Sequence, residues 1–468
     1  MSTAIIWFRQ DLRCQDNPAL TAACNAHDTV IPLYIAEKNL SSLIGSAQKW
    51  WLHHSLLNLQ KNLNCHGLNL YLVSGSPLAK LREIISQYQV DTIYWNHRYQ
   101  PEALKEDKEI KAALAKDNIA VKSFNGNLLF EPWETKNQQG NYFKVFPPFW
   151  RQYLTKLDTL PTTPAIKKWP SCPQVSSENL DSWQLIPTKP NWASKFKTFW
   201  QPGEDGAWQR LFYFLENNLN HYQTTRDYPA EQANSMLSPH LHFGEISPQQ
   251  IWQIIHSARN NKYHASSSEK FLTEIAWRDF CYHQLYYLPQ LATENIKPQF
   301  NQFKWRHAQE DFKRWSQGLT GFPMVDAGMR QLWQTGFMHN RVRMISASFL
   351  VKNLLIDWRI GADWFLETLL DADLALNSFN WQWTAGSNFE ACPPFRIFNP
   401  VAQGEKFDPE GDYIKEWLPE LAKLPKKWLH KPWLGHNLPI KLGKDYPYPM
   451  VDLQVTREQA LAEYRAIK

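Results

Sequence analysis

Residues 320–358 read TGFPMVDAGMRQLWQTGFMHNRVRMISASFLVKNLLIDW, and residues 371–400 read DADLALNSFNWQWTAGSNFEACPPFRIFNP. Arg341 and Arg343 lie inside an apolar helical pattern in the first segment, and Asp371 lies inside another in the second. Burying a charged side chain costs several kcal/mol unless it finds a partner. We therefore interpret this stretch as a polar pocket in an apolar, tryptophan-rich wall, which is typical of cofactor sites.

An ion pair between Arg343 and Asp371 would satisfy both charges. The residues alone leave two interpretations of this pair equally open, a buried structural salt bridge or part of a ligand site. Asn340, in the same helical pattern, also needs a polar partner.

Chain length, net charge and tryptophan content limit the class of protein. A chain of 468 residues is too long for one core, so two domains are expected. The formal charge of +5 permits a polyanionic partner without requiring one. Tryptophan is unusually frequent, with 23 residues, which suits either core packing or stacking on planar rings and electron transfer between indoles.

The six cysteines form no CxxC pair, and no His/Cys cluster has the spacing of a zinc site. A reducing compartment is expected. No charged and apolar leader follows Met1, and no apolar run approaches about 18 residues. We expect a soluble cytoplasmic protein without a metal, or a nuclear one in a host with a nucleus, and no membrane partner.

Short apolar runs alternate with helical patterns in the first part of the chain, which predicts a doubly wound parallel sheet. The expected strands are residues 4–8, 30–35, 69–73, 92–95 and 121–124. Neither a GxGxxG loop after the first strand nor a GxxxxGK[ST] loop is present. A ligand of this sheet would be expected at the carboxyl ends of the strands.

The rest of the chain differs in character. Residues 131–202 are rich in proline and read as a long connector that an aromatic cluster at residues 142–150 packs down. Residues 203–468 show helical patterns almost throughout, including one long helix at residues 339–356. We expect an α/β domain at 1–130, a linker, and an all-α domain at 203–468.

Two further segments carry polar residues of interest. Asn234, Ser235 and Ser238 precede a predicted helix, where they would suit a phosphate, although simple helix capping is the more economical explanation. Glu274 and Arg278 are spaced i,i+4. They are either an exposed ion pair or, with Trp277 on the same face, a set that hydrogen-bonds and stacks a nucleobase.

Several motifs resemble those of the photolyase/cryptochrome flavoproteins, and most closely the bacterial class I cyclobutane pyrimidine dimer (CPD) photolyases. The matching motifs are WFRQDLR from Trp7, TGFPMVDAGMRQL, MHNRVRMISASFLVK, LIDWR, DADLALN, NWQW and FRIFNP. The resemblance extends from Trp7 to the region of Pro419.

The resemblance implies an N-terminal α/β domain, a long linker and a helical domain that holds FAD. It implies FAD contacts from Tyr222, Asn234, Ser235, Met236, Leu237, Ser238, Asn340, Arg343, Asp371, Ala372, Asp373 and Asn377. Asn377 matches the residue beside flavin N5. The electron route to the flavin matches Trp305, Trp358 and Trp381, from the surface inward.

The resemblance also implies light-dependent repair, in which excited reduced FAD donates an electron to a dimer flipped out of DNA. The matching DNA-binding residues are Arg226, Glu274, Trp277, Arg278, Asn340, Arg341, Met344, Trp383 and Gln403. Glu274 would bond the base edge, and two tryptophans would enclose the dimer. The expected partner is ultraviolet-damaged DNA, bound by a monomer.

Two other activities exist among similar proteins. The (6-4) photolyases carry a His pair at positions that are Asn340 and Met344 here, which favours CPD repair. Blue-light sensors of this family often have another residue at the position of Asn377, and they often carry a C-terminal extension. Here the asparagine is present and the sequence ends at Lys468. A sensor without repair remains the alternative.

The antenna pigment stays undecided between methenyltetrahydrofolate and 8-hydroxy-5-deazaflavin, and a second flavin or an empty antenna site is also left open. Folate-binding relatives use a Cys-Lys pair where this chain has Ala292 and Thr293, which disfavours folate, while Glu102 lies near the matching acidic position. Phe379 stands where many relatives have small residues, and we expect it to affect the flavin edge.

Overall fold

The computed structural model describes residues 2–37, 44–258, 262–390 and 395–468. The chain forms two compact units. The first comprises Met1–Asn191, Trp200–Asn220 and Ser235–Pro289, and the second Trp192–Phe199, His221–Asn234 and Gln290–Lys468. The division at residues 130 and 202 stays a prediction, and Cys392 lies outside the described residues.

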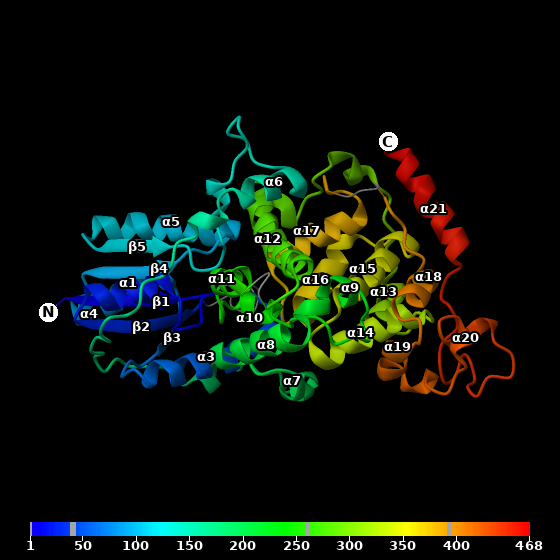
Figure 1. The fold of residues 1–468 in the computed structure, drawn as a ribbon, viewed down its shortest axis with the longest axis horizontal. Helices are drawn as coiled ribbons and strands as arrows, with labels where there is room; N and C mark the ends of the chain where they lie inside the picture. Colours follow the sequence, from blue (N-terminus) through cyan, green and yellow to red (C-terminus); the bar gives the residue numbers. More distant parts are fainter. Residues whose placement is uncertain (1, 38–43, 259–261, 391–394) are drawn as a thin grey trace. The chain divides into compact units, whose positions relative to one another are not determined.

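A five-stranded parallel sheet in the order β3-β2-β1-β4-β5 lies in the first unit (Figure 1), as the sequence predicts. The strands are β1 Thr3–Phe8, β2 Thr29–Ala36, β3 Tyr71–Ser74, β4 Thr92–Asn96 and β5 Ala120–Phe124. Ile5 pairs with Ile31 on one side and Ile93 on the other. Successive residues of β1 from Ala4 to Phe8 are all buried, so both faces of the central strand are covered, as in other parallel sheets.

Helices connect and cover the strands. Those of the first unit are α1 Pro18–Ala26, α3 Ser46–Asn64, α4 Pro77–Tyr88, α5 Pro101–Lys116, α6 Phe146–Leu154, α8 Glu204–Asn217, α10 Ser238–His242, α11 Pro248–Ala258 and α12 Ala265–Tyr287, with short turns at η1 Pro132–Glu134, η2 Leu157–Thr159 and η3 Leu180–Trp183. Leu81 of α4 and Leu114 of α5 complete the apolar core around Trp7 and Trp95. The Asn17 side chain accepts from Leu20 N and so begins α1.

The connector packs down, as its aromatic residues predict. Phe146 stacks on Trp277 with ring centroids 3.8 Å apart, and Phe149 lies 5.1 Å from Phe280. These contacts attach α6 to α12.

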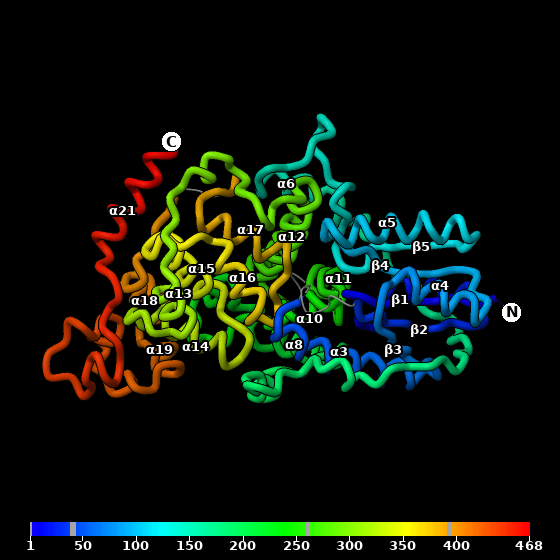
Figure 2. Tube along the Cα trace, turned by 180° about the vertical axis from the view of Figure 1, so that it is seen from behind, coloured from blue at the N-terminus to red at the C-terminus, as the bar shows by residue number. Residues whose placement is uncertain are grey.

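The second unit is helical. Its elements are η4 Trp192–Lys195, α7 Phe196–Phe199, α9 Tyr222–Thr225, η7 Pro298–Gln302, α13 Gln309–Ser316, α14 Pro323–Thr335, α15 Asn340–Ser348, η8 Phe349–Asn353, α16 Trp358–Thr368, α17 Leu374–Ala385, α18 Pro400–Phe407, α19 Asp412–Trp417, η9 Pro419–Leu421, α20 Lys426–Leu429, η10 Pro432–Leu434 and α21 Leu453–Ala466; η5 Leu219–His221 and η6 Pro289–Ala292 span segment boundaries. Figure 2 follows the chain through these helices to α21. Residues of α14 to α17 supply much of the core.

The single long helix expected at residues 339–356 is wrong. Helix α15 ends at Ser348 and passes into a π-helical turn, η8, after which Leu355 adopts a positive φ of 53°. Tertiary bonds hold the turn: Lys352 Nζ donates to Ala385 O at 2.5 Å, and Asn353 Nδ2 donates to Thr456 Oγ1 at 3.0 Å. Distant partners therefore end this helix, without a local glycine or proline.

Among the described helices, none combines the length and apolarity that crossing a membrane requires.

Candidate functional site

The expected pair of Arg343 and Asp371 is confirmed in the second unit. Arg343 Nη2 donates to Asp371 Oδ2 at 2.9 Å, and the Asp371 side chain is 5% exposed. Arg343 Nε also donates to Met338 O at 2.7 Å. The guanidinium is thus fixed at the N-terminal end of α15, beside the start of α17.

The residue just before α17 is the other aspartate of this region, Asp373. The Asp373 side chain accepts from Ala375 N and Leu376 N at 2.9 and 3.3 Å, so it caps the helix. One turn later, Asn377 Nδ2 donates to Ala362 O at 2.9 Å. That bond orients the amide, while Ala372 lies buried between the two aspartates.

The three expected tryptophans all lie in the second unit. Trp381 and Trp358 are buried, and Trp358 Nε1 donates to Asn295 Oδ1 at 2.9 Å. Trp305 is partly exposed and lies 4.4 Å from the ring of Phe303. Helix α16 approaches Trp381 so closely that a Cβ on Gly361 would come within 2.2 Å of its ring.

Arg341 has a partner that sequence reasoning missed. Its Nη2 donates to Asp227 Oδ2 at 2.7 Å, and its guanidinium lies 4.4 Å from the Phe407 ring. His339, also missed, accepts from Arg341 N through Nδ1 at 3.1 Å. Burial lowers the pKa of His339 to about 4, so this ring is neutral near pH 7.

The other expected residues of this unit lie on α9, α15, α17 and α18. Asn340 is exposed and its Nδ2 lies 4.0 Å from Met344 Sδ, one helical turn away. The Arg226 guanidinium lies 5.2 Å from the ring of the buried Tyr222. Trp383 and Gln403 are partly exposed, and Phe379 is buried within α17, where its effect on a flavin stays a prediction.

The expected phosphate loop is divided between the units. Asn234 belongs to the second unit, and Ser235 through Ser238 belong to the first. Within the first, Met236 has a positive φ of 56°, Leu237 N donates to Ser235 Oγ at 3.4 Å, and Ser238 begins the short helix α10. The loop's contact with a phosphate stays a prediction.

Helix α12 of the first unit places Glu274 and Trp277 at its surface, and Phe146 covers one face of the Trp277 ring. The interpretation of Glu274 and Arg278 as partners is wrong, because Glu274 pairs with Lys270 at 3.0 Å. Arg278 is 8% exposed and donates to Asn127 O at 2.6 Å and Leu241 O at 3.3 Å. Its buried bonds speak against the expected DNA contact and give it a structural role.

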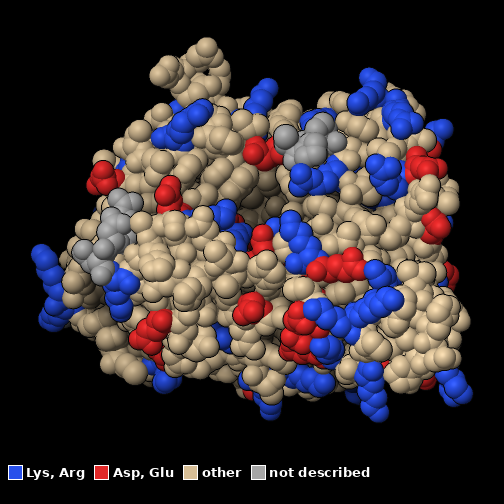
Figure 3. Space-filling view, turned by 45° about the vertical axis from the view of Figure 1, so that its right-hand side comes forward, with Lys and Arg blue, Asp and Glu red and all other residues tan. Residues whose placement is uncertain are grey.

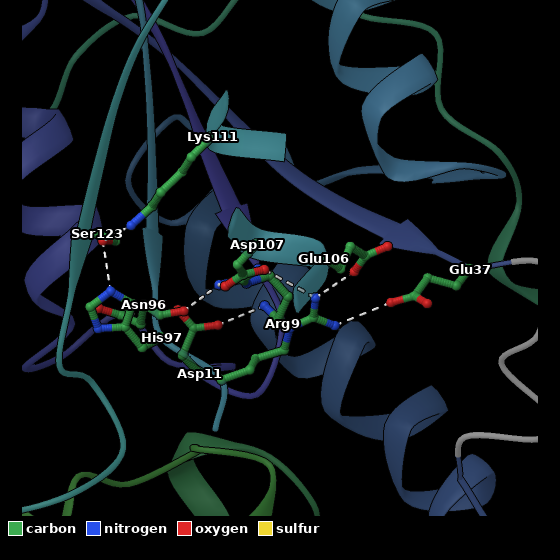
Figure 4. A network of polar contacts seen from close by, with 10 residues as sticks. Arg9, Asp11, Glu37, Asn96, His97, Glu106, Asp107, Lys111 and Ser123 are labelled. Atoms are coloured by element: carbon green, nitrogen blue, oxygen red, sulfur yellow. Dashed lines mark hydrogen bonds and ion pairs between the residues drawn. The ribbon is translucent and has the colours of Figure 1, made fainter. Parts of the chain in front are cut away.

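The carboxyl edge of the sheet carries a polar network (Figure 4). Arg9 donates to Asp107 at 2.9 Å and lies 4.5 Å from the Trp7 ring, and Arg98 joins Asp107 to Glu106. Parallel sheets bind ligands at this edge, where the strand order reverses between β1 and β4. The contacts leave the choice of antenna pigment undecided.

Comparison with known proteins identifies both parts of the chain. Residues 4–170 match the DNA photolyase family model, and residues 271–466 match the FAD binding domain of DNA photolyase. A parallel-sheet domain followed by a helical FAD-binding domain defines the class of photolyase-like flavoproteins. The chain belongs to the photolyase/cryptochrome family.

Individual relatives agree with this placement. The chain is 48% identical to the deoxyribodipyrimidine photo-lyase of Agrobacterium fabrum, over 99% of this chain and 98% of that protein. It is 36% identical to Arabidopsis thaliana cryptochrome-2, over 97% of this chain and 77% of that one. The crystal structure of a bacterial class III photolyase from Agrobacterium tumefaciens matches with a TM-score of 0.96 and 47% identity, covering 100% and 98% of the two chains. The expected class I assignment is not confirmed.

The residues present suit FAD. Arg343 provides a fixed cation, Asn377 a fixed amide and Asp373 a carboxylate, all beside an apolar core. This mixture of few polar groups in an apolar wall is typical of a site for a large planar cofactor.

Proposed function

We propose that this protein repairs cyclobutane pyrimidine dimers in DNA, using light and reduced FAD. The observation that carries the proposal is the 48% identity, along nearly the whole of both chains, to a deoxyribodipyrimidine photo-lyase. The family's (6-4) enzymes carry histidines where α15 presents Asn340 and Met344, which supports CPD repair over that alternative.

The residues of the second unit would bind the cofactor and set its properties. Arg343, Asp371 and Asp373 would hold FAD, and Asn377, oriented by Ala362 O, would meet the flavin ring. When bound, reduced FAD supplies on excitation the electron that opens the cyclobutane ring, and receives it back. Trp381, Trp358 and Trp305 would deliver electrons that restore the reduced state.

The DNA contacts follow from the chemistry of a flipped-out dimer. Trp277 and Trp383 would stack on the apolar lesion, and Glu274 would accept a hydrogen bond from its base edge. Arg226 and Arg341 would bind phosphates, so affinity should fall as salt rises. Ultraviolet-damaged DNA is therefore the proposed substrate, and a cytoplasmic monomer remains the expected form.

Repair can be measured directly. Chemically reduced protein is illuminated with an oligonucleotide that contains one thymine dimer, and intact thymines are counted by chromatography. Recovery of thymines in the light and none in darkness is expected. If the flavin stays reduced and no thymines are restored, the protein does not repair cyclobutane dimers. If the protein instead restores a (6-4) photoproduct, its substrate is that lesion.

A light sensor without repair is the second candidate, favoured by the 36% identity to cryptochrome-2. It predicts light-driven reduction of the flavin together with light-dependent partner binding. The same illumination assay separates the two, because a sensor restores no thymines.

Trp381→Phe tests the electron route. The substitution should remove most photoreduction of oxidised FAD, followed by absorbance, while dimer repair persists after chemical reduction. Trp417→Phe, another buried tryptophan of this unit, serves as the control and should retain photoreduction. Loss of repair in chemically reduced Trp381→Phe would count against the assigned role.

A further inference from the structure

Asp227 lies between two arginines that the proposed function assigns to DNA phosphates. It accepts from Arg341 Nη2 at 2.7 Å, and Arg226 Nε lies 3.9 Å from its other oxygen. The side chain of Asp227 is 36% exposed. The Arg341 side chain is 19% exposed, so the pair is partly buried. Such a pair adds on the order of 1 kcal/mol to folding, so stability alone gives little reason for a carboxylate here.

Arg341 is held in position by other contacts as well. Its guanidinium stacks on Phe407, its backbone N–H donates to His339, and Nη1 lies 3.8 Å from Met344 Sδ. Among the residues that the structure describes, none accepts a bond from Arg341 Nε. Because Nε is buried, an anion can approach Arg341 only through its Nη groups, and Nη2 already donates to Asp227.

The modest net charge of the chain makes a single carboxylate matter. On the face drawn in Figure 3, acidic side chains lie interspersed among the basic ones. The formal charge of the whole chain is only +5. Attraction of a polyanion then depends on local basic groups, and a neighbouring carboxylate lowers the net charge that those groups present.

We propose that Asp227 is an internal competitor for DNA phosphate, which limits the affinity of this site for undamaged DNA. This inference rests on the proposed function. A phosphate that reaches Arg341 must replace the Asp227 carboxylate, so one ion pair is exchanged for another and little is gained. Undamaged DNA relies on such phosphate contacts almost alone, whereas a flipped-out lesion adds stacking and base contacts.

Asp227→Asn in the FAD-loaded full chain tests the proposal. Binding of an undamaged single-stranded oligonucleotide is measured by fluorescence anisotropy at several salt concentrations. Affinity should rise about twofold to fivefold at low salt, the range expected for a partly exposed ion pair. The dependence on salt should steepen by up to about 0.7 in slope, because one more phosphate is neutralised. Repair in the presence of excess undamaged DNA should slow, while repair without competitor should stay close to wild type.

Two controls identify the cause. Asp412→Asn makes the same chemical change at an exposed aspartate that pairs with Lys415 at 3.0 Å, and should alter affinity little. In an Arg341→Ala background, Asp227→Asn should lose most of its gain. Asp227→Glu should restore the wild-type affinity.

Three results would overturn the proposal. The first is that Asp227→Asn binds undamaged DNA no more tightly than Asp412→Asn does. The second is that Asp227→Asn binds more weakly than wild type, which would show that Asp227 only positions Arg341, and the third is that its gain in affinity survives in the Arg341→Ala background. Should Asp227→Asn lose its FAD, Asp227→Ser removes the same charge and is measured instead. The affinity assay uses undamaged DNA, so failure of dimer repair would refute the proposed function independently of this result.

Discussion

At the scale of single residues, Gly361 shows how closely the helices around Trp381 approach. A methyl group there would meet the Trp381 ring at 2.2 Å and Leu350 at 2.6 Å. Alanine would ordinarily strengthen a helix over glycine by about 0.5–1 kcal/mol. The buried ring has no room to retreat, so the clash should prevail.

Gly361→Ala should therefore destabilise the protein by about 1–3 kcal/mol, the usual cost of overpacking a core. Urea unfolding followed by circular dichroism measures the change. Because the displaced ring belongs to the proposed electron route, photoreduction of FAD should slow as well. An unchanged midpoint would show that α16 moves freely against Trp381.

The ion pairs differ in how far the sequence predicted them. Arg343 and Asp371 were paired correctly, because both interrupt apolar patterns and need each other. The pair of Arg341 with Asp227 was missed, since 114 residues separate them and Asp227 stands in a polar segment. The partner of Arg278 was predicted wrongly. Its i,i+4 spacing suggested Glu274, but the side chain donates to the backbone oxygen of Asn127, which is distant in sequence.

At the scale of elements, Asp326 joins α14 to the segment before α21. It accepts from Thr320 N at 2.8 Å, Thr320 Oγ1 at 2.6 Å, Gly321 N at 2.9 Å and Tyr446 OH at 2.6 Å. Every donor faces a carboxylate oxygen. An asparagine would replace one carboxylate oxygen by an NH₂ group, which would face two of these donors.

Asp326→Asn should thus lower the free energy of unfolding by about 2–4 kcal/mol, since it leaves buried donors without acceptors. Asp311→Asn makes the same change in the more exposed pair with Arg306 and should cost no more than about 1 kcal/mol. Equal losses in the two variants, measured by urea unfolding, would contradict this role for Asp326.

His283 fastens the connector to α12 in one protonation state. Phe143 N donates to its Nε2 at 3.0 Å, and its Nδ1 lies 3.1 Å from Pro132 O, so the neutral ring carries its proton on Nδ1. Burial lowers its pKa to about 4. A second proton, on Nε2, would face the Phe143 N–H.

Stability should fall as pH drops from about 6.5 toward 4, because the unfolded chain then binds a proton that folded His283 refuses. This group's contribution is fully present above pH 6.5 and decreases by about 1.4 kcal/mol per pH unit below it. Urea unfolding of wild type and His283→Gln at pH 7 and pH 5 measures it. The variant should lose less stability between the two pH values, and an equal loss would refute the assignment.

Element positions follow from the sequence where local signals decide them. The five strands were placed within a few residues, because buried parallel strands read as short apolar runs between helical patterns. The end of α15 was missed, since Lys352 and Asn353 break the helix through partners on α17 and α21. No pattern near residue 349 announces those partners.

At the scale of the whole molecule, the first unit includes far more than the sheet. Cys14 N and Trp51 Nε1 donate to Glu204 and Glu245 at 2.9 and 2.8 Å, and Arg13 donates to Gly244 O. The sequence predicted an N-terminal domain at 1–130, which would leave these groups without acceptors.

A fragment of residues 1–130 should therefore unfold at lower urea concentration and less cooperatively than a fragment of residues 1–289, which restores those contacts. Far-ultraviolet circular dichroism measures both transitions. A sharp transition of the short fragment at the same midpoint would show that the sheet domain folds independently of α8 and α10.

The alternation of the chain between its two units has a consequence for biosynthesis. The first unit has all its segments once residue 289 has been made, but the second needs Trp192–Phe199 and His221–Asn234 to wait for Gln290–Lys468. The later of these two segments ends at Asn234, 234 residues before Lys468, so at about 5–20 residues per second its wait lasts roughly 12–47 s on the ribosome. Trp192, whose ring later stacks 4.9 Å from Trp333, stays without this partner until residue 333 has been made. The nascent chain thus exposes an apolar aromatic segment from the time that residue 199 of 468 has been made, and this interval is when a chaperone would bind it.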